Sequence, residues 1–238
     1  MYIDFHTHIL PDIDDGARGM EMALEMLAVA GECGAETVIL TPHVDASSDF
    51  DKFLSVRNEK YAALCDAALK DGRKFPKLLR GAEVLLDTAL SECEGARSLC
   101  IEGTELLLLE LPYTSWNSWY SHEIHNIIKN HGVIPVLAHI ERYINNVTDI
   151  KKLEQLISLG AKFQINASSF LSFSGRRIIR ELAADGLISA IGSDAHNLSR
   201  RSPDIKKALN AFGKKFGPDF IDYMYGKTSE LLEKYSCK

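Results

Sequence analysis

Short apolar runs alternate with longer amphipathic segments along the chain, and this alternation is the feature that most constrains the fold. The apolar runs predict strands at residues 2–5, 37–41, 77–85, 104–112, 133–139, 162–167 and 188–194. The other segments have helical spacing, at about 18–33, 50–71, 117–131, 148–159, 174–185, 202–215 and 217–235. Strands that are apolar throughout are typical of parallel sheets covered by helices on both faces. The sequence therefore predicts an α/β protein.

Seven βα units favour one domain over residues 1–238, folded as a closed or distorted α/β barrel. No Pro-, Gly- or Ser-rich linker and no low-complexity segment divides the 238 residues. An open doubly wound sheet is the competing architecture. It is disfavoured because the G-x-G-x-x-G turn of dinucleotide-binding proteins does not follow the first strand.

Charge and cysteine content disfavour several classes of function. The net charge of −6 argues against a nucleic-acid-binding protein, which usually carries a basic face. The five cysteines include no C-x-x-C and no C-x5-R, so we expect reduced thiols in a cytoplasmic protein. We expect no signal peptide, because no basic region followed by an apolar one occurs at the N-terminus, and the longest apolar run, 106–109, is too short to span a membrane.

Every predicted strand ends at a polar side chain. The carboxyl ends of parallel strands meet at one face of an α/β barrel, where active sites are built. Imidazoles and carboxylates that converge there predict more than one divalent metal ion. The strand-end residues are His6, His8, His43, Glu83, Glu110, His139, Asn166, Asp194 and His196.

Three aspartates follow the H-x-H pair of the first strand in the stretch "DIDDG". We expect Asp15 to supply an additional metal-binding carboxylate. Asp14 is assigned instead to the cap of the following helix, and Asp12 to a turn in the loop.

Five motifs carry a resemblance to a known superfamily over nearly the whole chain. "DFHTH" (4–8), "TPH" (41–43), "GAE" (81–83), "AHIERY" (138–143) and "SDAHN" (193–197) resemble the polymerase and histidinol phosphatase (PHP) superfamily. "DIDDG" (12–16), "HIERY" (139–143) and the arginine five residues after His196 narrow the match. With these, the chain resembles the bacterial manganese-dependent protein-tyrosine phosphatases encoded with capsule and exopolysaccharide genes.

The resemblance implies a distorted (β/α)7 barrel with a trinuclear metal site, occupied by Mn²⁺, although Zn²⁺ or iron also suits such donors. It implies that Arg142 and Arg201 hold the phosphate of a phosphotyrosine protein, with the Tyr-rich tail of a cognate tyrosine kinase as the partner. That group usually has Gly and then Arg-Pro after "HNL", so Arg200 remains an alternative to Arg201 here. The implied ligands are His6, His8, Asp15, His43, Glu83, Glu110, His139, Asp194 and His196.

Hydrolysis of a phosphate monoester by a metal-bridged hydroxide is the reaction that these residues predict. Asp194, His196 and His43 are the candidate proton donors to the leaving group. A tyrosyl phenolate has a pKa of about 10 and needs little help from an acid, which favours an aryl phosphate. The aromatic residues of 112–120 either border a pocket for such a ring or pack together: Tyr113, Trp116, Trp119 and Tyr120.

Three other functions compete with this hypothesis. A histidinol-phosphate phosphatase of the same superfamily would need a closed pocket, whereas short loops predict an open mouth. A non-catalytic PHP module that binds metal is disfavoured because the ligand set is complete. A metal-dependent nuclease is disfavoured by the acidic net charge.

Overall fold

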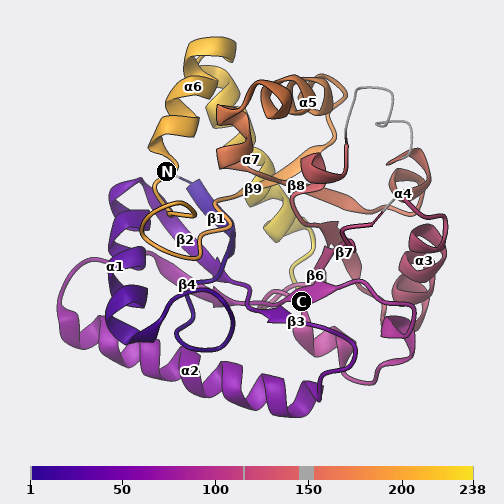
Figure 1. Ribbon diagram of the computed structural model, residues 1–238, viewed down its shortest axis with the longest axis horizontal. Helices are drawn as coiled ribbons and strands as arrows, with labels where there is room; N and C mark the ends of the chain where they lie inside the picture. The colour runs from indigo at the N-terminus through magenta and orange to yellow at the C-terminus, as the bar shows by residue number, and fades with distance from the viewer. Residues whose placement is uncertain (1, 115, 145–152, 238) are drawn as a thin grey trace.

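Parallel strands form the wall of a distorted barrel in this computed structural model, which describes residues 2–114, 116–144 and 153–237 (Figure 1). They form two sheets, in the orders β1-β2-β4 and β3-β5-β6-β7-β8-β9. The described strands are β1 (Tyr2–Thr7), β2 (Ala35–Leu40), β3 (His43–Val44), β4 (Lys77–Arg80), β5 (Glu83–Leu85), β6 (Leu106–Glu110), β7 (Ile134–Leu137), β8 (Lys162–Asn166) and β9 (Ile188–Gly192).

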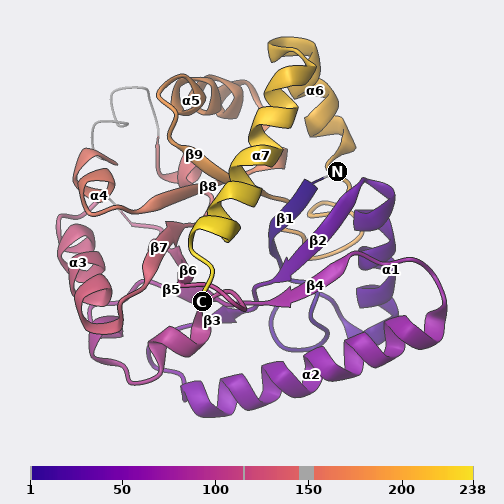
Figure 2. The same ribbon diagram turned by 180° about the vertical axis from the view of Figure 1, so that it is seen from behind.

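Helices surround the strands in both views (Figures 1 and 2). The α-helices are α1 (Gly19–Glu32), α2 (Phe50–Asp71), α3 (Trp119–His131), α4 (Glu154–Ser158), α5 (Phe173–Ala184), α6 (Lys206–Phe216) and α7 (Pro218–Lys234). Short 3₁₀ segments are η1 (Leu90–Glu92), η2 (Ala96–Leu99), η3 (Ile140–Tyr143) and η5 (Ala167–Leu171). Helix α7 packs against β9 and β1.

The prediction of one strand over 77–85 is wrong, because that run divides into β4 and β5. The strand predicted at 37–41 corresponds to β2, and a second short strand, β3, follows it after Pro42, which has no N–H to donate to a ladder. The two breaks fit together: Gly81 N donates to Leu40 O at 2.8 Å, and Glu83 N donates to Pro42 O at 3.0 Å. A side chain at Gly81 would place its Cβ only 3.2 Å from Thr41 Cγ2.

The β2–β3 and β4–β5 segments both cross from the first sheet to the second and so join the two sheets at one edge. At the other edge, Thr7 bridges Ala195 in parallel, and Asp194 N donates to His6 O at 2.9 Å. The described strands therefore occupy seven successive positions round a closed but distorted wall, which agrees with the (β/α)7 expectation.

Strand β6 packs apolar side chains on both of its faces. Leu106 and Leu108 belong to a smaller core cluster that also contains Leu231 of α7, while Leu107 and Leu109 belong to the large core, to which α1 to α7 all contribute. Successive residues of a strand face opposite sides, so a strand packed on both sides is apolar throughout.

Several helix boundaries differ from the predicted ones. The helix predicted at 202–215 begins only at Lys206, because residues 196–201 form a tight turn in which His196 N donates to Arg201 O at 2.8 Å. The helix predicted at 117–131 begins at Trp119. The start of the helix predicted at 148–159 lies outside the described residues, and α4 covers Glu154–Ser158. Helix α2 has the predicted bounds, with Asp49 accepting from Lys52 N at its start.

Candidate metal centre

One buried carboxylate, that of Glu83, lies at the centre of the candidate site. Its Oε2 is 3.0 Å from His6 Nε2 and 3.2 Å from His8 Nε2. The same oxygen is 3.2 Å from His43 Nδ1, while Oε1 is 3.0 Å from His139 Nε2. Imidazoles from three separate strand positions thus face the two oxygens of one side chain.

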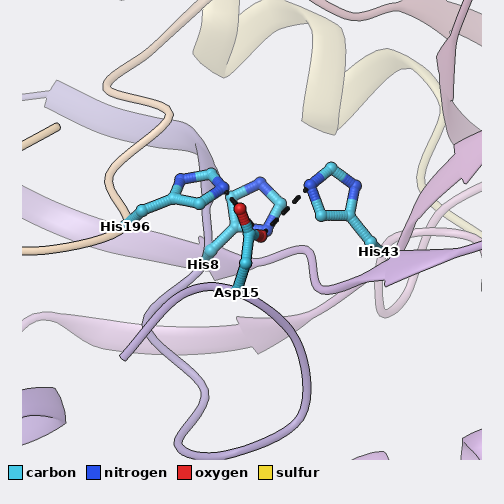
Figure 3. A group of neighbouring side chains, drawn as sticks. All are labelled: His8, Asp15, His43 and His196. Atoms are coloured by element: carbon cyan, nitrogen blue, oxygen red, sulfur yellow. Dashed lines mark ion pairs between the residues drawn. The ribbon is translucent and has the colours of Figure 1, made fainter. Parts of the chain in front are cut away.

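A second group of side chains forms an open rim above this floor. Figure 3 shows the Asp15 carboxylate between the rings of His196 and His43, beside the ring of His8. Asp15 Oδ1 is 3.3 Å from His196 Nε2 and 3.6 Å from His43 Nε2. His196 Nε2 is buried without a hydrogen-bond partner among the described residues, and the Asp15 side chain is 67% exposed. The rim therefore combines a buried imidazole nitrogen that lacks a hydrogen-bond partner with an exposed carboxylate, and both can bind metal.

The structure brings all nine predicted ligands together. They include three overlapping groups in which the ligand atoms all lie within 4.8 Å of one another. His139 joins the third group through its Nε2, 3.4 Å from Glu110 Oε1. The groups are His8, Asp15, His43 and His196; His6, His8 and Asp194; and His43, Glu83 and Glu110.

The geometry of the first two histidines fits bound cations. His6 Nδ1 lies 3.2 Å from Gln164 Oε1 and His8 Nδ1 lies 2.8 Å from Asp14 Oδ2, so each Nδ1 faces an acceptor and carries a proton. The two Nε2 atoms, 3.0 Å apart, then turn their lone pairs toward each other when the rings are neutral. A divalent metal ion removes this repulsion, and an acceptor on the far nitrogen is the usual support of a metal-binding imidazole.

The contacts of His8 and Asp14 shift the pKa values of both residues. Burial lowers the pKa of His8, but its hydrogen bonds with Asp14 and Glu83 outweigh burial and raise it to about 10. Burial raises the pKa of Asp14, but the contacts with His8 and two backbone N–H groups outweigh it and lower the pKa to about 2. Asp14 is therefore an ionised carboxylate that accepts a hydrogen bond from the Nδ1–H of His8.

The assignment of Asp14 as a helix cap was wrong, whereas Asp12 lies in a turn of the loop as expected. Asp14 does not cap the following helix, because its carboxylate accepts from His8, from Gly16 N and from His43 N. Asp12 does so instead: its Oδ1 accepts from Gly19 N, the first residue of α1, at 2.8 Å.

Two arginines converge on Asp194 at the rim. Arg142 Nη2 donates to Asp194 Oδ2, and Arg201 Nη2 donates to Oδ1 at 2.6 Å. Burial raises the pKa of Asp194, but His6, Arg142, His8 and Arg201 outweigh it and hold the pKa below the usual range. The side chain of Arg200 is exposed and forms no hydrogen bond or ion pair within the described ranges. Arg201, rather than Arg200, therefore adjoins the site.

Gln164 is a site residue that the sequence did not single out. Its Oε1 accepts from His139 N at 2.8 Å and from His6, and its Nε2 donates to Asn166 Oδ1 at 3.0 Å. Asn166 Nδ2 in turn donates to Asp194 Oδ2 at 2.7 Å. His139 and Asp194 both have a positive φ, of 32° and 55°, and these contacts hold that unfavourable backbone in place. Two polar residues on one face of the buried strand β8 were the available signal.

The aromatic residues of 112–120 take both of the expected roles: one borders the site, and the others pack together. Tyr113 borders the site: its hydroxyl accepts from Arg142 Nη1 at 2.8 Å, its ring centroid is 6.2 Å from that of His139, and it is 64% exposed. Trp116 and Trp119 instead pack their rings against the buried Tyr120, with centroids 5.7 Å and 4.7 Å away.

Comparison with known proteins identifies the family. Residues 2–232 match the family described as capsular polysaccharide synthesis, CpsB/CapC. The chain belongs to the CpsB/CapC family. The resemblance that the sequence motifs predicted is thereby confirmed.

Relatives of known name support this placement. The chain is 30% identical to the tyrosine-protein phosphatase YwqE of Bacillus subtilis, over 97% of this chain and 91% of YwqE. It is also similar to one of the crystal structures of YwqE and of CpsB from Streptococcus pneumoniae, described as metal-dependent tyrosine phosphatases. That match has a TM-score of 0.82 and 26% identity, and covers 99% of this chain and 96% of the other.

A more distant likeness concerns the fold alone. The phosphotriesterase of Mycobacterium tuberculosis aligns with a TM-score of 0.60 and 11% identity, over 100% of this chain and 95% of that one. The predicted α/β class and distorted barrel are confirmed. Within residues 2–114, 116–144 and 153–237, no helix is both long and apolar enough to cross a membrane.

Proposed function

We propose that this CpsB/CapC chain is a metal-dependent protein-tyrosine phosphatase that hydrolyses phosphotyrosine in proteins. One observation carries the proposal: nine candidate metal-binding side chains converge at one face of the barrel, next to two arginines that both contact Asp194. Family membership and the phosphatase named YwqE support the same activity.

We infer that the nine candidate ligands hold divalent metal, and that the three overlapping groups bind three Mn²⁺ ions. Zn²⁺ and iron suit the same donors. When bound, such ions activate water at neutral pH and neutralise the charge of the phosphoryl group. Asp14 and Gln164 fix which nitrogens of His8 and His6 are free to bind.

The rim residues bind and orient the phosphate ester. Arg142 and Arg201 present permanently charged guanidinium groups, which pair with phosphate oxygens through two parallel hydrogen bonds. The exposed ring of Tyr113 lies beside them and offers an apolar surface to the aryl group of the substrate. Because the phenolate that leaves has a pKa of about 10, strong protonation by a side chain is not required.

The wider setting of the activity follows from the same proposal. The partner is a phosphotyrosine protein, with the Tyr-rich tail of a cognate tyrosine kinase as the specific candidate. We place the protein in the cytoplasm. We also treat residues 1–238 as one domain, because both edges of the two sheets are joined.

A histidinol-phosphate phosphatase of the same superfamily is the alternative. Its small alkyl substrate needs an enclosed pocket, whereas the side chains of Arg201 and Asp15 at this rim are 39% and 67% exposed. An open rim is better suited to a phosphate carried on a protein.

The deciding experiment compares two substrates. Metal-free protein is reloaded with Mn²⁺ and assayed with a phosphotyrosine peptide and with L-histidinol phosphate at matched concentrations. We expect a clear preference in kcat/KM for the peptide, abolished by chelator and by His6→Ala or Arg142→Ala in folded protein. A preference for histidinol phosphate, or wild-type rates in both variants, would overturn the proposal.

A further inference from the structure

A cavity of about 210 Å³ lies between α5 and α6, and none of the nine candidate metal ligands lines it. One part of its wall is aromatic, formed by Phe170, Phe173 and Phe216. The other part is cationic, formed by Arg176, Arg177, Arg180 and Lys215. We refer to it as the α5–α6 cavity.

The positive charge of the α5–α6 cavity is largely unneutralised. Arg180 pairs with Glu181 at 2.9 Å, and Arg176 donates to the carbonyl of Leu171 at 3.0 Å. Arg177 and Lys215 have no ion-pair partner within the described parts of the chain. This excess of cations occurs in a protein whose net charge is −6, so the cavity attracts anions that the rest of the surface repels.

The aromatic wall combines a fixed part with an exposed part. Phe170 is fully buried and stacks on Phe212, with centroids 3.5 Å apart, and Phe216 lies 5.6 Å from it. Phe173, the first residue of α5, is 80% exposed. A large exposed apolar side chain beside cations is typical of binding sites for ligands that carry both an apolar and an anionic group.

The α5–α6 cavity is close to the metal centre along the chain. Asn166, which contacts Asp194, is four residues before Phe170 and seven before Phe173. An extended chain spans at most about 3.6 Å per residue, so the Cα atoms of these phenylalanines lie within about 14 Å and 25 Å of that of Asn166. Ser169 Oγ also donates to Glu141 at 2.7 Å, which ties η5 to η3, the segment that carries Arg142.

We propose that the α5–α6 cavity is a second, non-catalytic binding site for a phosphorylated tyrosine of the same substrate chain. The inference rests on the proposed phosphatase activity and names a preferred substrate, one that carries two phosphotyrosines. The phenyl ring packs on the aromatic wall while the phosphate pairs with the guanidinium groups. Holding one phosphotyrosine there raises the effective concentration of the other at the metal centre.

The test uses peptides with a hydrolysable phosphotyrosine and, seven residues further on, either a non-hydrolysable difluorophosphonate analogue of phosphotyrosine or phenylalanine. Seven extended residues reach about 25 Å, which matches the upper limit on the Cα separation of Asn166 and Phe173. We expect the analogue to lower KM by about tenfold with kcat unchanged. Arg177→Glu with Lys215→Glu should abolish this difference, while hydrolysis of p-nitrophenyl phosphate stays at the wild-type rate.

A charge-matched control is Lys52→Glu with Lys70→Glu, two exposed lysines of α2, which should keep the tenfold difference. Peptides with the analogue at both positions allow affinity to be measured without turnover, by fluorescence anisotropy. Loss of affinity in the Arg177/Lys215 variant alone supports the second site even if phosphotyrosine is not the hydrolysed group.

Three results would overturn the proposal. The analogue could give no advantage over phenylalanine, both double variants could lose the advantage equally, or the Arg177/Lys215 variant could lose only binding to anionic lipid vesicles. In each case, normal hydrolysis of the singly phosphorylated peptide would leave the proposed phosphatase activity standing.

Discussion

Three aspartates within four residues have three different environments. Asp12 caps α1 through Gly19 N, Asp14 is bonded to His8, and the side chain of Asp15 stands exposed on the rim. Residue type alone does not distinguish them, because the difference lies in the partner that the fold brings to each. Substitutions of these neighbours therefore separate the roles of capping, orientation and metal binding.

Asp14→Asn should weaken metal binding without unfolding the protein. An amide N–H₂ facing His8 Nδ1 would favour the proton on Nε2, the nitrogen needed for metal, and loss of such an orienting partner typically costs about 10–100-fold in affinity. Competition with a fluorescent chelator measures this effect. Asp12→Asn keeps an acceptor for Gly19 N and should bind metal as the wild type does; equal affinity in all three proteins would refute the role given to Asp14.

Arg201→Ala should reduce kcat/KM for a phosphotyrosine peptide by about 10²–10³-fold, as expected for a group that stabilises charge on the transferring phosphoryl. Arg200→Ala removes the same charge one residue away, from an exposed side chain, and should stay within about twofold of the wild type. Steady-state kinetics at saturating Mn²⁺ compares the two. Equal losses would mean that general surface charge, rather than contact at the rim, accounts for the effect.

At the scale of elements, the site depends on how closely β9 approaches β1 and β8. Gly192 ends β9, and a Cβ there would lie 2.7 Å from His6 Cβ and 2.9 Å from Gln164 Nε2. No side chain fits at this position unless the strand that carries the first two histidines moves.

Gly192→Ala should therefore destabilise the protein by about 1–3 kcal/mol, the usual cost of an overpacked core, and should weaken metal binding as well. Gly226→Ala in α7 is the control: nothing lies within 4 Å of its Cβ, and alanine in a helix is favoured by about 0.5–1 kcal/mol. Urea unfolding of the metal-free proteins measures the change in stability of each variant. A Gly192→Ala variant as stable as the wild type would contradict the close approach.

The sequence predicted the elements better than their breaks. Apolar runs located every strand position, because a strand buried on both faces leaves a continuous signal. The point within residues 77–85 at which the chain passes from one sheet to the other left no signal in the sequence. It depends on contacts with Thr41 and Pro42, which belong to the neighbouring segment of the wall. The ligands stood out because imidazoles and carboxylates are unusual at the ends of apolar runs. Gln164 and Asp14 did not stand out in the sequence. Their roles depend on contacts that only the folded chain brings together.

At the scale of the whole molecule, the ligands come from every part of the barrel wall except β8, so metal should stabilise the entire fold. At free Mn²⁺ of 100 times the dissociation constant, one site adds about 2.7 kcal/mol to the free energy of unfolding. In a protein of this size that raises Tm by about 5–10 °C.

Chelator should therefore lower Tm by that amount, and Mn²⁺ should restore it, in thermal scans followed by circular dichroism. Arg142→Ala should keep the metal-dependent shift, since Arg142 contacts the phosphate side of the rim, whereas His8→Ala should lose most of it. The assignment fails if the wild type shows no shift, or if His8→Ala shows the same one.

The bridge between Thr7 and Ala195 also determines when the protein can become active during its synthesis. The ribosome makes His6 and His8 first, but Asp194, Ala195 and His196 follow some 190 residues later. Until then the outer edge of β1 has no partner, and a nascent chain has two fewer metal ligands. Arrested or truncated translation products that stop before residue 194 should therefore be inert toward phosphate esters and prone to aggregate through that open edge.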